Sequence, residues 1–275
     1  MWNLLVTAFQ GWMKHHSPRL GAALAYYAVF SLGPLLLIVI AIAALLFDRE
    51  TVTTAINTQL SGLIGENGAR ALEAMRQGAS SQSSGKAASI AGVVLLIIAA
   101  VGVVAQLKDA LNTIWEVDET RESGVWPFIR TYVVSMAGIM ALGFLLATSL
   151  VLSTVLASVS QFFPGGSALG QFAEVVVSFI VLTVLFAALF KYFPDTTVNW
   201  SDVWIGGAAT AALFQLGKVA IAWYIGTQSF ESTYGAAASL VVLLIWVYYA
   251  SQIVLFGAEL TRAYALTRRK EPQKT

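Results

Sequence analysis

The chain has 275 residues, of which 57% are hydrophobic and only 11% are charged. Because soluble domains carry about 25% charged residues, this composition excludes an ordinary water-soluble globule. The net charge of +1 excludes a basic field over the whole surface that would recruit nucleic acid, and the absence of cysteine excludes disulfides and thiolate metal sites.

The N-terminal segment, residues 1–14, predicts a helix that lies in the membrane interface. Its apolar side chains recur at helical spacing and belong to Trp2, Leu5, Val6, Phe9, Trp12 and Met13. A signal peptide is not indicated, because no cation precedes the apolar part and Asn3, Thr7 and Gln10 interrupt it. Lys14 follows the apolar positions, so we expect an amphipathic interfacial helix.

Long apolar segments predict an all-α, polytopic membrane protein. Residues 87–107, 131–160 and 235–258 contain no Asp, Glu, Lys, Arg or His. Each is long enough for the roughly 20 residues that a membrane-spanning helix needs. We therefore expect six spans within a single transmembrane domain, residues 1–265, at 20–47, 87–107, 128–157, 171–193, 202–226 and 234–262.

The distribution of Lys and Arg predicts that both termini lie in the cytoplasm. With that orientation the external segments hold only Arg49, Arg70, Arg76 and Lys86. The cytoplasmic segments, which include a basic tail at 266–275, hold Lys14, Arg19, Lys108, Arg121, Arg130, Lys191, Arg262, Arg268, Arg269, Lys270 and Lys274. This excess of cations is typical of the cytoplasmic side.

The longest external segment, residues 48–86, is expected to contain helix. Val52, Ile56, Leu60 and Leu63 recur at helical spacing. The segment could form a helical cap over an external vestibule, or an amphipathic hairpin that rests on the lipid headgroups. The sequence leaves both possibilities open.

Lys218 is a cation within a predicted span, in AALFQLGKVAIAWYIG (211–226). It lies roughly 12 Å from the external end of that span, at about 1.5 Å per residue. A charge near the middle of the bilayer costs about 2.5–3.5 kcal/mol on insertion scales, so the side chain must snorkel or pair. Glu174 and Glu231 lie near the same end and are candidate partners. The alternatives are a polar site in the bundle and a purely structural ion pair or snorkelling lysine.

Glu259, in VLFGAELTRAY, is the second ionisable group within a predicted span. Lys108 and Asp109 are expected at the same cytoplasmic level, so these residues could belong to the polar site. The structural alternative is a carboxylate at a helix end that pairs with Arg262 or Lys108. Gly257 would let another helix approach closely at this point.

Small residues and one proline predict close packing and a helix kink. GGAATAA (206–212) and YGAAAS (234–239) both contain pairs of small residues spaced four apart, which allow helix backbones to approach. Pro34 removes one backbone donor within the first predicted span. Kinking or packing roles are therefore expected for Pro34, Gly206, Gly207, Gly235 and Gly257.

A hydrolytic enzyme finds little support in the residues. His15 and His16 are adjacent, which is not a metal-ligand spacing, and no P-loop, GxSxG or HExxH motif is present. The acidic residues Glu116, Asp118 and Glu119 are better explained as a solvated linker than as a cation site. We expect no metal and no cofactor.

Four stretches resemble the YihY / virulence factor BrkB family of bacterial inner-membrane proteins. They are LGAALAYYAVFSLGPLLLIVIAIAALLF, ALNTIW, YFPDTTVNWSDVWIGGAATAALFQLGKVAIAWYIG and YGAAASLVVLLIWVYYASQIVLFGAEL, and the similarity runs from about residue 17 to 265. The resemblance implies six helices, a bacterial inner membrane and transport of lipidic or envelope material. The resemblance also implies an older name of the family, ribonuclease BN. The recurring family positions are Tyr26, Tyr27, Pro34, Asn112, Pro194, Trp200, Lys218, Tyr234, Gly235, Trp246, Gly257 and Glu259.

Three hypotheses follow for function. The leading one is a transporter-like or lipid-handling protein in which Lys218, Glu174 and Glu259 line a polar cavity. Its partners would be the bilayer and a lipidic or anionic small molecule, with no nucleic acid. The second is a structural or assembly factor without transport activity, and the third is an enzyme that acts on RNA or lipid.

Overall fold

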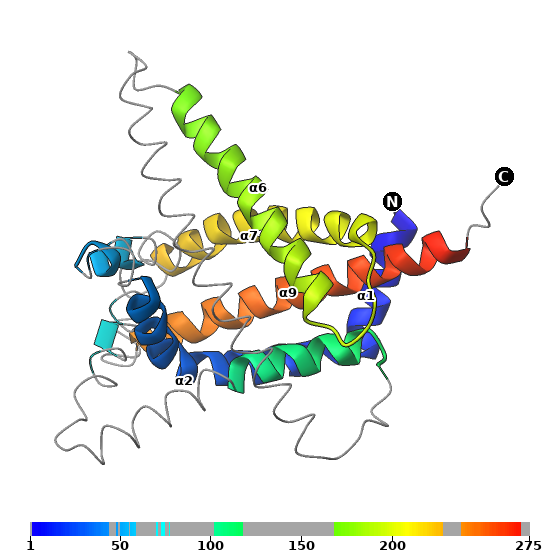
Figure 1. The fold of residues 1–275 in the computed structure, drawn as a ribbon, viewed down its shortest axis with the longest axis horizontal. Helices are drawn as coiled ribbons and strands as arrows, with labels where there is room; N and C mark the ends of the chain where they lie inside the picture. The colour runs from blue at the N-terminus through cyan, green and yellow to red at the C-terminus, as the bar shows by residue number, and fades with distance from the viewer. Residues whose placement is uncertain are drawn as a thin grey trace.

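The computed structural model describes residues 2–43, 48, 50–54, 56–58, 70, 73–74, 77, 102–117, 168–227 and 238–270. Every regular element in these ranges is a helix, and no strand occurs in them (Figure 1). The helices are α1 (Trp2–Lys14), α2 (Ser17–Ala43), helical residues 102–114, α6 (Ala168–Tyr192), α7 (Trp200–Thr227) and α9 (Ala238–Lys270).

The described helices surround α9. In Figure 1, α2, α7 and α9 run along the long axis of the view, and α1 runs across them at the end where α9 finishes. Helix α9 packs against α1, α2 and α7, and α6 packs mainly against α7. The long C-terminal helix therefore connects the N-terminal helices with the α6–α7 pair.

Within the described residues, three helices are long and apolar enough to cross a membrane. Their qualifying segments are Val175–Tyr192, Trp200–Ile221 and Leu240–Arg268. They correspond to the last three predicted spans, and α2 corresponds to the first. The predicted span at 128–157 and most of that at 87–107 lie outside the described residues. Helix α9 continues past the predicted end at Arg262 to Lys270, so the start of the predicted basic tail is helical.

The main core joins residues from five segments of the chain. Leu24 of α2, Leu111, Phe190 of α6, Val203 of α7 and Leu255 of α9 are all buried in one apolar cluster. Between helices in a membrane the hydrophobic effect is weak, because the acyl chains of the lipids are as apolar as leucine. Close packing therefore holds these helices together.

Two Gly–Thr pairs bring α7 and α9 into backbone contact. A Cβ built at Gly206 would collide with Thr261, and one at Gly257 would collide with Thr210. Each threonine hydroxyl donates a hydrogen bond within its own helix, Thr210 to Gly206 O at 2.6 Å and Thr261 to Gly257 O at 2.8 Å. The hydroxyls are therefore satisfied, and small residues spaced four apart set the register of the two helices.

Gly207 makes the corresponding contact with α6. A Cβ at this position would lie 2.8 Å from the carbonyl oxygen of Thr183, which cannot move without disturbing its helix. Pro34 lies within α2, but its side chain is outside the described part of the structure, as is Gly235.

The segment predicted to be external, residues 48–86, begins with a helical stretch that packs on α2. Residues 50–54 and 56–58 are helical, and Val52 is buried against Ile40 and Ile56. The choice between a helical cap and a surface hairpin depends mainly on residues outside the described ranges.

Helix α1 presents an apolar side away from the bundle. Ala8 is fully buried against Leu260 and Ala263 of α9. Trp2 and Phe9, by contrast, are 77% and 55% exposed. The segment is thus helical with an exposed apolar side, and its expected position in the membrane interface stays a prediction.

Candidate functional site

One end of the bundle collects cations from several helices. Helix α7 begins and α9 finishes there, and α1 crosses α9 at the same end (Figure 1). We call it the basic end and define it by Lys14, Lys108, Lys191, Arg262 and Arg268.

A buried carboxylate–histidine pair lies where α1 crosses α9. Glu259 is 2% exposed, and its Oε1 lies 2.6 Å from Nδ1 of His15, itself buried between α1 and α2. A Cβ built at Gly11 would collide with Oε2 of Glu259. Glycine at this turn of α1 lets the helix lie directly against the carboxylate, and a larger residue would require the Glu259 side chain to move.

His15 lies between two carboxylates. Its second ring nitrogen, Nε2, is 3.2 Å from Oε1 of Glu116, which follows helical residues 102–114. A neutral imidazole has one N–H donor, and an ionised carboxylate can only accept. Both contacts therefore require either an imidazolium or a protonated carboxyl group.

Glu116 faces the outer side of this cluster and is 44% exposed. Its carboxylate lies 2.5 Å from Lys14 Nζ and 2.5 Å from an Arg262 guanidinium nitrogen. The hydrogen bond from Lys14, followed by that from His15, lowers the pKa of Glu116 from 4.5 to about 2. Glu116 is thus ionised near neutral pH and can only accept, so the hydrogen bond between it and His15 is donated by His15 Nε2.

The backbone at Glu116 is held in an unfavourable conformation. Its φ is 49°, in the left-handed region where glycine is preferred. Hydrogen bonds from Glu116 N to Thr113 O and from Val117 N to Asn112 O close the preceding helix, so Glu116 occupies the usual glycine position of a helix C-terminus. This conformation costs roughly 1–2 kcal/mol for a residue with a side chain. The contacts with Lys14 and Arg262 offset that cost.

Lys108 does not join Glu259. It lies 3.0 Å from Asp195, in the connection between α6 and α7. Asn112 binds the same aspartate twice: its amide donates to Asp195 Oδ2 at 3.0 Å and accepts from Asp195 N at 2.8 Å. The expected pairing of Glu259 with Lys108 or Arg262 is therefore wrong, because both cations bind other carboxylates and His15 takes their place.

Lys218 lies at a different depth from Glu259. Gly206 of α7 meets Thr261 of α9, whereas Gly217 meets Tyr249. Lys218 is therefore about 15 Å from the level of Glu259 along the bundle, at about 1.5 Å per residue. The two side chains do not belong to one cluster of contacting groups.

The predicted partners of Lys218 fall outside the described side chains. Lys218 itself is partly buried, and no hydrogen bond or ion pair links it to another residue whose side chain is described. Glu174 lies in α6 without a described side chain, and Glu231 is outside the described ranges. The pairing stays a prediction. Asp109, also a candidate, is exposed on helical residues 102–114.

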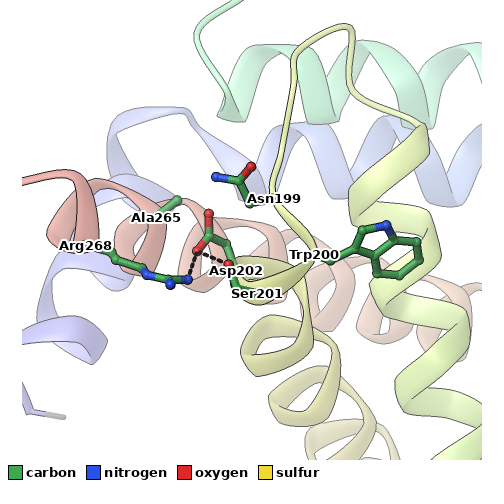
Figure 2. Close-up of a pocket in the computed structure, with 6 residues that line it drawn as sticks. All are labelled: Asn199, Trp200, Ser201, Asp202, Ala265 and Arg268. Carbon is green, nitrogen blue, oxygen red and sulfur yellow. Dashed lines mark hydrogen bonds and ion pairs between the residues drawn. The ribbon is translucent and has the colours of Figure 1, made fainter.

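A second polar site, an open pocket of about 520 Å³, lies at the basic end. Asp202 is 3% exposed and its Oδ1 lies 3.4 Å from both Arg268 Nη1 and Ser201 Oγ. Figure 2 shows the carboxylate between the amide of Asn199 and the guanidinium of Arg268. The pocket is lined by Asn199, Trp200, Ser201, Asp202, Ala265 and Arg268.

The remaining family positions differ in their surroundings. At the basic end, Asn112 binds Asp195, the residue after Pro194. Trp246 is buried against Phe214. Tyr26, Tyr27 and Trp200 are exposed, and Tyr234 is outside the described ranges.

Sequence reasoning identified Glu259 but missed the groups around it. The sequence indicates no role for His15, because two adjacent histidines do not make a metal site, and it favours a solvated linker for Glu116. The described residues contain no group of three or more His, Asp or Glu side chains arranged to hold a metal ion. One feature points to a special role of Glu116: it stands at the C-terminal end of helical residues 102–114, where glycine is usual.

The fold and the site together define a helical membrane protein with a buried charge cluster at one end. The chain belongs to the virulence factor BrkB family, whose model matches residues 8–275. This confirms the resemblance read from the sequence motifs. No solved structure matches the chain.

Several relatives carry the name UPF0761 membrane protein. The relative from Alkalilimnicola ehrlichii is 31% identical over 249 residues, covering 89% of this chain and 54% of the relative. That from Albidiferax ferrireducens is 30% identical, covering 89% of this chain and 59% of the relative. A third, from Actinobacillus pleuropneumoniae, is 25% identical and is covered over 89% of its length. The chain thus spans little more than half the length of the first two.

Proposed function

We propose that the protein is a transporter-like or lipid-handling protein of the bacterial inner membrane with a polar site at its basic end. The observation that carries the proposal is Glu259, a 2%-exposed carboxylate on a helix of membrane-spanning length. Ionisable groups in such helices are costly, and they commonly mark the path of a substrate or ion.

The length of α9 supports a position for this site near the lipid headgroups. No charged residue lies between Ala238 and Glu259. This stretch measures about 30 Å at about 1.5 Å per residue, which equals the thickness of the hydrocarbon core. Glu259 would then lie at the edge of the hydrocarbon, and the cations of the basic end would lie in the headgroup layer.

The same cations support an orientation with the basic end in the cytoplasm. Lys and Arg are enriched on the cytoplasmic side of inner-membrane proteins. Both α1 and the C-terminal part of α9 lie at the basic end, so both termini would be cytoplasmic. The site would then contact headgroups of the inner leaflet.

Lipid translocation in reconstituted vesicles tests the proposal. The protein is placed in liposomes that contain a fluorescent phospholipid, and a membrane-impermeant reductant quenches only the outer leaflet. We expect quenching beyond the outer-leaflet fraction with the unaltered protein and a marked loss with Glu259→Gln. Glu50→Gln, an exposed glutamate outside the basic end, is the matched control and should behave as the unaltered protein. No translocation by well-folded, unaltered protein would reject lipid movement.

A structural or assembly role is the second candidate. The observation in its favour is that the cluster ties three segments together: α1 and its end, the turn at Glu116, and α9. A brace of this kind can often be replaced by well-packed apolar residues without loss. A site that binds or moves a substrate would lose its activity on the same replacement.

The ribonuclease label finds no support in these observations. The printed names of the relatives describe a membrane protein and state no enzymatic activity. An enzyme would show metal-dependent turnover of RNA by the purified protein in detergent, and we expect none above a mock purification.

A further inference from the structure

We propose that the pocket between α7 and α9 binds the phosphoethanolamine headgroup of a phospholipid, with its ammonium group on Asp202 and its phosphate on Arg268. This site is separate from the His15–Glu259 pair. Binding does not require that the protein move lipids, so the inference goes beyond the function proposed above.

Asp202 is an acceptor that is buried but incompletely used. Both of its contacts, from Arg268 and from Ser201, reach Oδ1 at 3.4 Å. Charge-assisted hydrogen bonds are normally about 2.7–2.9 Å long, so the ion pair between Arg268 and Asp202 is a long one. Within the described part of the chain Oδ2 receives no hydrogen bond. The carboxylate can therefore accept hydrogen bonds from a cationic ligand.

Arg268 supplies the opposite charge at the mouth of the same pocket. Its side chain is 55% exposed, against 4% for Asp202. A guanidinium with free N–H donors matches the oxygens of a phosphate. One pocket thus offers an accessible cation and a buried anion, which suits a ligand that carries both charges a short distance apart.

The buried acceptor selects a primary ammonium group. Ethanolamine has N–H donors that can bind Asp202, whereas the Asn199 amide turns its nitrogen toward the carboxylate in Figure 2. The trimethylammonium group of choline has no N–H donor, and it would leave the carboxylate desolvated without a hydrogen bond. Phosphatidylglycerol would match Arg268, but it would offer Asp202 only neutral hydroxyl donors, which form weaker hydrogen bonds with a carboxylate than an ammonium group does.

The surroundings of the pocket favour a lipid over a soluble ligand. Trp200 is among the pocket residues and is 43% exposed, although its ring points away from Asp202 (Figure 2). The rings of Tyr192 and Trp204, which are 65% and 44% exposed, lie against the ring of Trp200. Exposed Trp and Tyr gather at the headgroup level of membranes. Ala265 lies about 9 Å beyond Glu259 along α9. That distance is slightly larger than the thickness of a headgroup layer, about 5–8 Å, for a helix that is perpendicular to the membrane, and a tilted helix covers less depth.

Lipid binding to the purified full chain tests the inference. Native mass spectrometry in detergent measures the bound fraction of phosphatidylethanolamine, phosphatidylcholine and phosphatidylglycerol with identical acyl chains. We expect phosphatidylethanolamine to bind at least about tenfold more tightly than phosphatidylcholine, the effect of one charge-assisted hydrogen bond. Equal binding of these two lipids would overturn the proposal.

Variants assign the preference to this pocket. Asp202→Asn should abolish the discrimination between ethanolamine and choline lipids, whereas Arg268→Gln should weaken both phosphatidylethanolamine and phosphatidylglycerol. Glu50→Gln and Arg70→Gln are matched controls from exposed positions outside the basic end and should change nothing. Unchanged selectivity in a folded Asp202→Asn variant would overturn the assignment.

A fallback comparison and a competition measurement complete the test. If Asp202→Asn does not fold, the selectivity of the unaltered protein and the effect of Arg268→Gln decide the outcome. Soluble glycerophosphoethanolamine, added as a competitor, should displace the lipid only at far higher concentration. Binding of the soluble compound as tightly as the lipid would overturn the assignment to a membrane ligand.

Discussion

Replacement of Glu116 by glutamine removes the anion at the outer side of the charge cluster. Lys14 and Arg262 each lie 2.5 Å from this carboxylate, and the hydrogen bonds from Lys14 and His15 lower the pKa of Glu116 from 4.5 to about 2. A carboxyl group with a lowered pKa stabilises the folded state above its unfolded pKa. That contribution is lost as pH falls from 4.5 through the folded value of about 2.

The expected effect is modest. At about 1.36 kcal/mol per pKa unit, the full change in pKa would correspond to about 3 kcal/mol. The side chain of Glu116 is 44% exposed, and solvent screening reduces the contribution to about 1 kcal/mol. A change of this size lowers an unfolding temperature by about 2–4 °C in a protein of comparable size.

Thermal unfolding of the purified protein in detergent measures this effect. We expect Glu116→Gln to unfold at a lower temperature than the unaltered protein at about pH 7, with the two curves converging between pH 4.5 and about 2. Added salt should reduce the difference near neutral pH. Glu50→Gln serves as the control. The reasoning would be refuted if Glu116→Gln had the unfolding temperature of the unaltered protein at about pH 7, or if its unfolding temperature were lowered equally at about pH 7 and at about pH 2.

Three further predictions concern packing and the predicted site. Gly206→Ala should lower the unfolding temperature because its Cβ would lie 2.9 Å from Gly257 O, whereas Gly102→Ala, whose Cβ would lie 3.4 Å from the nearest ring atom, should be tolerated. The chain has no native cysteine, so a double variant with Ala8→Cys and Ala263→Cys should cross-link α1 to α9 on mild oxidation. Recovery of only uncross-linked protein would contradict the packing of α1 on α9. Lys218→Met should abolish translocation while Lys218→Arg retains it, and normal activity of both would remove Lys218 from the substrate path.

The helices were the most predictable part of this molecule. The uncharged run at 235–258 predicts α9, because a membrane-spanning helix must be apolar over most of its length. The largely apolar segments at 171–193 and 202–226 predict α6 and α7, although each contains charged residues. The ends were less predictable. Helix α9 runs on to Lys270, because charged residues are compatible with a helix once it has left the hydrocarbon.

The charge cluster could be predicted only in part. Glu259 was recognisable because a single carboxylate in an apolar stretch requires a partner. Its actual partner, His15, lies 244 residues away in the chain, and Glu116 lies 101 residues from His15. Contacts over such separations depend on how α1 crosses α9, and no local pattern reports that crossing. For the same reason the Asp202–Arg268 pocket was not foreseen.

The central claim is that the buried pair formed by His15 and Glu259 is a working site and not only a brace. The most direct measurement is lipid translocation by the double variant His15→Phe with Glu259→Leu, compared with the unaltered protein at matched folding and reconstitution. We predict that the apolar pair keeps the protein folded, with an unfolding temperature close to the original, and abolishes translocation. Full translocation by this double variant would contradict the claim and would leave the pair a structural role.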